Sequence, residues 1–426
     1  MLKPLSLALM ASLTLSACVT DDSGSDEIDL SDLRSYDSSS DYAENLTICP
    51  VLYQQGRECK ISSLPPLLVD SGERPTIDDV MARVAVSHQW MGDNFRDALT
   101  AMPEEVLTMM RPLAAIVIDD DIRPSFFLPS AGTIYLDPKY LWLTEAEKNT
   151  INDKEDFRTA FSAQMTTRPA WRYVDGDSYA YAGNDSSSRT FDEMTENLAR
   201  LLFHELAHAN DFIEVNRLAS LNQDAGFSSL LNTEGGQMSQ AVVAANPLQS
   251  STMINYAAAY YLGQNASDFT QSLRGSSAGA SLETEGANAT YGYSTRYEDF
   301  AMLVEETMML RHFGYRRDTA FYEEDVIGED EDNNDIIAYN VYWGQRGRIG
   351  NDLVKPRALH AMQELLPDTD WASFFDSLAE PTAMRVGESW GDNLDLSNSN
   401  DGIRISADDS SRATTPGSND FASPHQ

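Results

Sequence analysis

Apolar side chains recur at three- and four-residue spacing from Thr76 to about Met110, and this period predicts a helical segment. Two short apolar runs follow it. The run 115–118 predicts a buried strand. The run 133–136 predicts a second strand, because a glycine precedes it and an Asp-Pro turn ends it. Helical and strand patterns in one region indicate an α+β fold.

Two longer helices carry the strongest periodic patterns in the chain. The first is predicted to start near Asp192 and to run to about Leu218, and the second to run from about Tyr297 to His312. Between them, residues 221–290 loosen into Ser, Ala, Gly and Asn with short helical pieces. We therefore expect a mainly helical α+β body with a small sheet.

The composition divides the chain into a folded body and two polar ends. The body is predicted to span 67–390. Residues 18–66 begin rich in Asp, Glu and Ser with little apolar periodicity, which predicts an acidic tether that stays in solvent. Residues 391–426 are mainly polar and predict a disordered tail.

The acidic stretch 323–335 predicts a solvated loop. A calcium site is the alternative, although the spacing lacks the glycine of an EF-hand loop.

The N-terminus has the features of an export signal. Residues 1–17 carry an early lysine and an apolar stretch too short to cross a bilayer as a mature helix. Leu15-Ser16-Ala17-Cys18 resembles a bacterial lipobox, which implies cleavage before Cys18 and a lipid on its sulfur. Val19, rather than Asp, follows this cysteine, which resembles the sorting of lipoproteins to the outer membrane. We therefore expect an anchor in the outer membrane, with the body in the periplasm or at the cell surface. An ordinary signal peptide with an unmodified cysteine is the alternative.

Cysteine usage agrees with export. The chain has three cysteines, which are Cys18, Cys49 and Cys59. If Cys18 carries lipid, one pair remains in an oxidising compartment, and this predicts a Cys49–Cys59 disulfide. A catalytic thiol is the weaker alternative, because no histidine lies near either cysteine in the sequence.

The net charge excludes one class of partner. The chain has 30 Lys and Arg residues against 67 Asp and Glu residues, a net charge of −37. A field of this sign repels the phosphate backbone, so nucleic-acid binding is not expected. Apolar residues make up 42% of the chain, enough for a packed core.

The motif HELAH, within FHELAHANDF at 203–212, carries the candidate chemistry. His204 and His208 are four residues apart on the first long helix, so both imidazoles face the same side and can bind one ion. Glu205 points to nearly the same side and can act on a water molecule at that ion. HExxH on a helix is typical of zinc sites that hydrolyse amides. A chance pair of histidines on a helix is the alternative.

Zinc needs a third protein ligand. One zincin class continues as HExxHxxGxxH, but here Asp211 replaces the glycine and Glu214 the last histidine, which disfavours that class. Another class takes a glutamate from a later helix. The second long helix offers one within YGYSTRYEDFAMLVEE at 291–306.

These two strings together resemble the gluzincin peptidases of the anthrax lethal factor and Mlc titration factor type. Those families carry HExxHxxD on one helix, then a tyrosine seven residues before a ligand glutamate in an E-F-F-A-like string. Tyr291 and Glu298 have this separation, and the string matches apart from Asp299. The resemblance covers the two motif helices, and the long insert between them is unexplained.

The resemblance implies a zincin-like fold, with a small sheet packed on the HExxH helix, and a role for each matched residue. His204, His208 and Glu298 bind zinc, Glu205 is the general base, and Tyr291 stabilises the oxyanion. Zincins also place an edge strand beside the cleft where an extended peptide adds as another strand. The run 133–136 is the candidate for this strand.

Each role has an alternative that the residues leave open. Glu298 is also favourable as an acid at a helix N-terminus. Glu305, seven residues further on, is either a rival ligand, a residue supporting a ligand, or a solvent-facing acid. Asp211 shares the face of the histidines and either holds a ligand imidazole or lies at the surface. Tyr291 is otherwise one aromatic among 18 tyrosines.

The leading hypothesis from the sequence is a lipid-anchored, zinc-dependent peptidase of the bacterial cell envelope, acting on peptide or protein substrates. The first alternative is a non-catalytic envelope lipoprotein that uses a zincin scaffold for binding. The second is an acidic structural lipoprotein in which HELAH occurs by chance.

Overall fold

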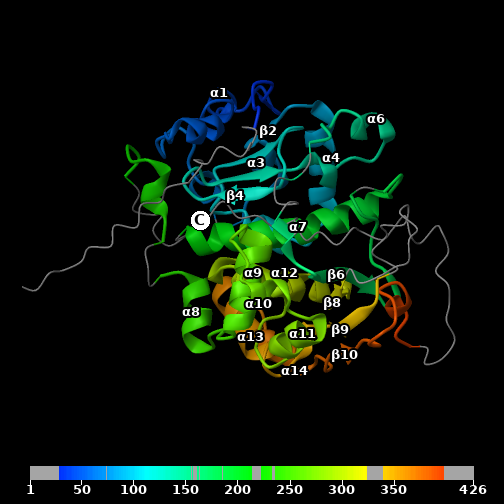
Figure 1. Cartoon of the computed structure of the whole chain (residues 1–426). Helices are drawn as coiled ribbons and strands as arrows, with labels where there is room; N and C mark the ends of the chain where they lie inside the picture. The colour runs from blue at the N-terminus through cyan, green and yellow to red at the C-terminus, as the bar shows by residue number, and fades with distance from the viewer. Residues whose placement is uncertain are drawn as a thin grey trace, which may run out of the picture.

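The computed structural model describes residues 28–72, 74–154, 156, 161–162, 164–184, 186–213, 222–232, 236–323 and 339–397. The expected signal peptide, Cys18 and most of the expected tail lie outside these residues, as does the acidic loop except for Glu323. The fold is α+β, with many helices and two five-stranded sheets (Figure 1).

The first sheet lies in the N-terminal half and has the order β1-β2-β3-β5-β4. Its central strands β2 (Val84–Val86), β3 (Ala115–Ile118) and β5 (Thr133–Leu136) are parallel. The edge strands β1 (Arg34–Ser35) and β4 (Phe126–Leu128) are antiparallel to their neighbours. The bounds of β3 and β5 confirm the two strands predicted from short apolar runs. Such runs are expected where both faces of a parallel sheet are covered.

The second sheet lies towards the C-terminus and has the order β10-β9-β8-β6-β7, with all neighbours antiparallel. Its two longest strands, β6 (Thr167–Asp175) and β8 (Arg316–Glu323), pair with each other from Thr167 to Val174 of β6. The shorter strands are β7 (Ser178–Tyr179), β9 (Val341–Arg346) and β10 (Thr382–Ala383). The sequence did not reveal this sheet, because its strands lie far apart in the chain.

Helix α7 (Phe191–Phe212) is central to the molecule. It contacts β4 on the side of the first sheet and α12 (Arg296–Phe313) on the side of the second sheet (Figure 1). Every residue from Asn197 to Asp211 is buried. In the described part of the chain, none of the helices combines the length and apolar character needed to cross a bilayer.

The remaining helices surround these elements. In the N-terminal half they are α1 (Ala43–Leu46), α2 (Leu67–Ser71), α3 (Ile77–Met81), α4 (Gln89–Ala101), α5 (Glu105–Met109) and α6 (Glu145–Lys148). In the C-terminal half they are α8 (Met238–Ala245), α9 (Ser251–Leu262), α10 (Asp268–Gln271), α11 (Gly275–Glu283), α13 (Lys355–Leu365) and α14 (Trp371–Asp376). Short 3-10 turns include η1 (Cys49–Gln55), η2 (Pro138–Tyr140), η5 (Phe227–Leu230), η6 (Thr290–Tyr293), η8 (Arg348–Gly350) and η9 (Asp392–Leu394).

The helical segment predicted from Thr76 to Met110 is wrong as one element. It divides into α3, β2, α4 and α5. The residues Val84–Val86 are all buried and pair with β3, so β-branched side chains favour a strand there despite the helical spacing around them. Pro103 separates α4 from α5, because proline has no N–H to continue a helix.

The boundaries of the first long helix also differ. Thr190, rather than Asp192, is the N-cap, and it forms a capping box with Glu193. The helix ends at Phe212 instead of Leu218, because Ile213 is extended and bridges to Leu231. The second long helix, α12, confirms the predicted Tyr297–His312 to within one residue at each end.

The described part of the expected tether, from residue 28 onwards, is not a solvated segment. Strand β1 pairs with β2, and Leu30, Leu33 and Leu46 are buried. These apolar residues are too sparse to form a periodic pattern in the sequence. They are buried nevertheless, because β1 pairs with the edge of β2 and the leucines pack into the main core. The first residues of the expected tail also pack on the body, since Asn393 and Leu394 are buried.

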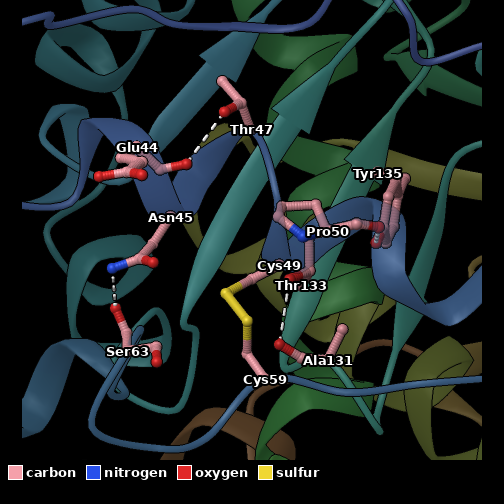
Figure 2. The surroundings of a disulfide bond; sticks show 10 residues. All are labelled: Glu44, Asn45, Thr47, Cys49, Pro50, Cys59, Ser63, Ala131, Thr133 and Tyr135. Atoms are coloured by element: carbon pink, nitrogen blue, oxygen red, sulfur yellow. Dashed lines mark hydrogen bonds between the residues drawn. A yellow bond between two sulfur atoms is a disulfide. The ribbon is translucent and has the colours of Figure 1, made fainter.

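Cys49 and Cys59 form a disulfide that closes a short loop (Figure 2). The loop lies against the first sheet, where the Tyr135 hydroxyl donates to the Pro50 carbonyl at 2.6 Å. Beyond the loop, the Ile61 N–H donates to the Ala225 carbonyl at 2.9 Å. The loop therefore joins the sheet to the segment that follows α7.

Candidate metal centre

His204 and His208 lie one turn apart in the middle of α7, which holds both rings rigidly. Their ring centroids are 4.9 Å apart, and the two side chains are 1% and 2% exposed. The capping box at Thr190 starts the helix, and its leucines pack into the main core. The local sequence therefore determines that both imidazoles leave the helix on the same side.

Glu298 comes from the first turn of α12, which packs along α7 (Figure 1). Thr295 is the N-cap, and its hydroxyl accepts the Glu298 N–H at 3.1 Å. The Glu298 carboxylate is 1% exposed and lies against the two imidazoles. Glu298 is thus an acid at a helix N-terminus, and its side chain is also directed at the histidines.

Three donor atoms converge on one point. Glu298 Oε2 lies 3.0 Å from His204 Nε2 and 3.3 Å from His208 Nε2. The two Nε2 atoms are 3.3 Å apart. Among the described residues, this is the only group of three or more His, Cys, Asp or Glu side chains spaced to hold a metal ion. Glu298 Oε1 has no hydrogen-bond partner in the same part of the chain.

Glu298 and His204 shift each other's pKa values. Burial by itself raises the pKa of Glu298, but the two imidazoles outweigh it and hold that pKa well below its usual range. Burial lowers the pKa of His204, whereas Glu298 and Glu305 raise it, and the result is about 9. A positive ion bound at this point would replace the positive charge that a raised pKa gives to His204.

Glu205 lies on the side of α7 that faces the first sheet. It is 3% exposed, and burial raises the pKa of its carboxyl. The neighbouring imidazoles and the backbone N–H of Phe127 in β4 act in the opposite direction. A raised pKa suits a group that accepts and then returns a proton.

Strand β4, not β5, is the edge of the first sheet beside α7. The expectation that residues 133–136 form the edge strand is therefore wrong. That run is buried between β3 and β4, as its unbroken apolar character suits. Residues 126–128 are similarly apolar, so composition does not separate an edge strand from a central one.

Tyr291 lies in η6, beside His204 of the three-residue group that could hold a metal ion. Its ring centroid is 6.2 Å from that of His204 and 4.8 Å from that of Tyr261. The structure thus brings Tyr291 to the same site as the histidines. Its role towards an oxyanion stays a prediction.

Glu305 lies behind His204, away from the point where the three donors meet. Its Oε2 is 3.3 Å from His204 Nδ1, on the opposite edge of the ring from Nε2. This position fits a residue that supports a ligand and does not fit a rival ligand. Two partners of Glu305 were not found from the sequence: Tyr173 on β6 and Arg200 on α7.

Asp211 joins α7 to α8, and Asp299 joins α12 to α13. Asp211 Oδ1 accepts the backbone N–H of Ser239 at 2.8 Å, at the start of α8. Burial raises the pKa of Asp211, and hydrogen bonds from Ser239 partly offset this effect. Asp299, which departs from the family string, forms a buried ion pair with Arg357 of α13.

Comparisons with protein-family models, with curated proteins and with solved structures returned no match to this chain.

Proposed function

We propose that this chain is a zinc-dependent peptidase of the gluzincin type, anchored by lipid to the bacterial cell envelope. The observation that carries the proposal is the convergence of His204 Nε2, His208 Nε2 and Glu298 Oε2, which are 3.0 to 3.3 Å apart. Ligand atoms bound tetrahedrally at about 2.0–2.1 Å from zinc lie about 3.3–3.4 Å from one another. The donor set has nearly this spacing and consists of groups that zinc prefers.

Two imidazoles and one carboxylate are typical of a catalytic zinc site, in which the fourth position is left for water or substrate. Zinc held there supplies Lewis-acid chemistry, because it lowers the pKa of a water molecule and polarises a carbonyl oxygen. The zincin-like arrangement, with a small sheet beside the HExxH helix, is supported by the contact between α7 and β4.

The chain's own residues provide the remaining steps of amide hydrolysis. Glu205 takes a proton from the attacking water and delivers it to the leaving amine. The Tyr291 hydroxyl donates a hydrogen bond to the carbonyl oxygen as negative charge develops on it. The edge strand β4 contacts α7, so an extended peptide held along this edge would lie next to the HExxH helix.

The burial of the centre favours a second candidate, a non-catalytic envelope lipoprotein that uses the same scaffold for binding. His204, Glu205, His208 and Glu298 are each between 1% and 3% exposed. A peptide must reach these groups before it can be cleaved. The two candidates share the metal centre and differ only in turnover.

Replacement of Glu205 by Gln tests the proposal. We expect the variant to keep the zinc content of the wild type and to cleave a library of unstructured peptides about 10²–10⁴ times more slowly. Glu196→Gln, on the same helix, is the control and is expected to cleave at the wild-type rate. Equal cleavage by wild type and Glu205→Gln contradicts the peptidase mechanism. Zinc without cleavage in the wild type supports the non-catalytic scaffold.

A further inference from the structure

The side of His204 that faces away from the three donor atoms contacts a buried carboxylate. Glu305 lies on α12, seven residues after Glu298, and is 0% exposed. Its Oε2 is 3.3 Å from His204 Nδ1. A ligand histidine needs such a partner, because a proton held at Nδ1 leaves the lone pair of Nε2 directed at the metal.

Glu305 is itself held by a residue from the second sheet. The Tyr173 hydroxyl, on β6, donates to Glu305 Oε1 at 2.8 Å, although 132 residues separate the two. Burial raises the pKa of Tyr173 well above its usual range, so its hydroxyl stays protonated and remains a donor. The two oxygens of Glu305 thus have different neighbours: Tyr173 at one and His204 at the other.

A buried arginine also lies close to Glu305. The Arg200 guanidinium, one turn before His204 on α7, lies 3.7 Å from Glu305 Oε2 and is 0% exposed. It also donates to the Tyr140 hydroxyl at 3.0 Å. A buried carboxylate is costly unless it is paired and hydrogen-bonded. Arg200 supplies the charge, and Tyr173 supplies a directed hydrogen bond.

We propose that Tyr173 is a positioning residue for the metal centre, because its hydroxyl fixes the Glu305 carboxylate against Nδ1 of His204. The inference rests on the proposed function, since it takes His204 as a metal ligand. Tyr173 does not touch the metal position and acts through Glu305. The second sheet is therefore part of the support of the metal centre and not only a neighbouring layer.

Replacement of Tyr173 by Phe removes the hydroxyl and keeps the ring. We expect zinc affinity, measured on the full chain by competition with a chromogenic chelator, to weaken about tenfold, the lower end for such supporting contacts. Tyr256→Phe is the matched control. Tyr256 is also buried, and its hydroxyl donates to the Thr167 carbonyl at the start of the same strand at 2.7 Å. We expect the Tyr256→Phe variant to bind zinc with the affinity of the wild type.

A double-mutant cycle with Glu305→Gln separates positioning from a general loss of stability. If Tyr173 acts through Glu305, Tyr173→Phe has little further effect on zinc affinity in the Glu305→Gln background. The visible absorption of bound Co²⁺ gives a second readout, which we expect to shift in Tyr173→Phe and not in Tyr256→Phe.

Three results would overturn the inference. They are equal zinc affinity in Tyr173→Phe and wild type, equal weakening in Tyr173→Phe and Tyr256→Phe, and fully additive effects of Tyr173→Phe and Glu305→Gln. The first two leave the proposed function intact, provided that the wild type binds zinc. Absence of zinc binding by the wild type would instead overturn the proposed function together with the inference.

Discussion

Glu298 Oε2 lies 3.0 Å from His204 Nε2, although 94 residues separate the two side chains. The contact joins the first turn of α12 to the middle of α7. It brings a carboxylate to a pair of imidazoles that the sequence already places on one helical face.

Replacement of Glu298 by Gln is expected to remove most of the bound metal. An amide lacks the negative charge of the carboxylate, so one of the three ligands is lost. Elemental mass spectrometry of the purified protein is expected to fall from about one zinc per chain to well below that value. Glu306→Gln is the matched control, since Glu306 is buried on the same helix but is not one of the three converging ligand residues. Equal zinc in wild type and Glu298→Gln would exclude Glu298 as a ligand.

Replacement of Tyr291 by Phe is expected to lower kcat by about 10²–10³ with little change in KM, as loss of one oxyanion donor does. Zinc content is expected to stay the same, because the Tyr291 ring remains beside His204. Tyr293→Phe serves as the control within η6, where the Tyr293 hydroxyl donates to Glu285 at 3.2 Å. An unchanged kcat in Tyr291→Phe would show that the oxyanion is stabilised by another group.

The free energy of unfolding is expected to fall as pH rises from about 4 to 7. Burial, only partly offset by Arg317 and hydrogen bonds, raises the pKa of Glu306 to about 7, and burial also raises the pKa of Asp119 to about 7. The folded state therefore holds protons that the unfolded state has already released. Stability from these carboxyls is present below their ordinary pKa and is lost as pH approaches 7.

Chemical denaturation at several pH values measures this slope. Glu306→Gln and Asp119→Asn are each expected to flatten it, by up to about 1.4 kcal/mol per pH unit for a single group. Asp370→Asn is the control, because Asp370 is exposed and hydrogen bonds from Ser373 lower its pKa. A slope that is identical in the wild type and both buried variants would contradict the assignment.

Removal of the disulfide by Cys49→Ser together with Cys59→Ser is expected to cost about 2–3 kcal/mol, the chain-entropy value for a short loop. The loop also holds the segment after α7, since Glu58 accepts the Ser228 N–H at 2.7 Å. Thermal unfolding is expected to shift down by about 5 °C. Reductant is expected to produce the same shift in the wild type and none in the double variant. A shift in the double variant on reduction would assign the effect to another cause.

Much of the candidate site is visible in the sequence because its information is local. The helical period places His204 and His208 on one face of a long helix, and the string around Glu298 marks a second helix. The apolar runs of β3 and β5 are likewise local patterns that buried parallel strands require. These features depend on neighbours within one or two turns of a helix or within one strand, so one chain is sufficient to predict them.

Other features depend on partners that are distant in the chain. The strand Val84–Val86 lies within a helical pattern and becomes a strand because β3 pairs with it. The acidic segment from residue 28 packs because the open edge of β2 accepts β1. Composition does not encode which edges are open, so both expectations failed for the same physical reason.

The sequence by itself was enough to predict a site at the two histidines and the neighbouring glutamate, with a candidate third ligand on a later helix. The tertiary structure decided that Glu298 reaches both imidazoles, that Glu305 lies behind His204, and that Tyr173 and Arg200 surround Glu305. Helical periodicity is a property of adjacent residues, whereas these contacts arise from packing α7 against α12 and the second sheet. Packing of this kind is set by the whole buried core and is not readable from any one segment.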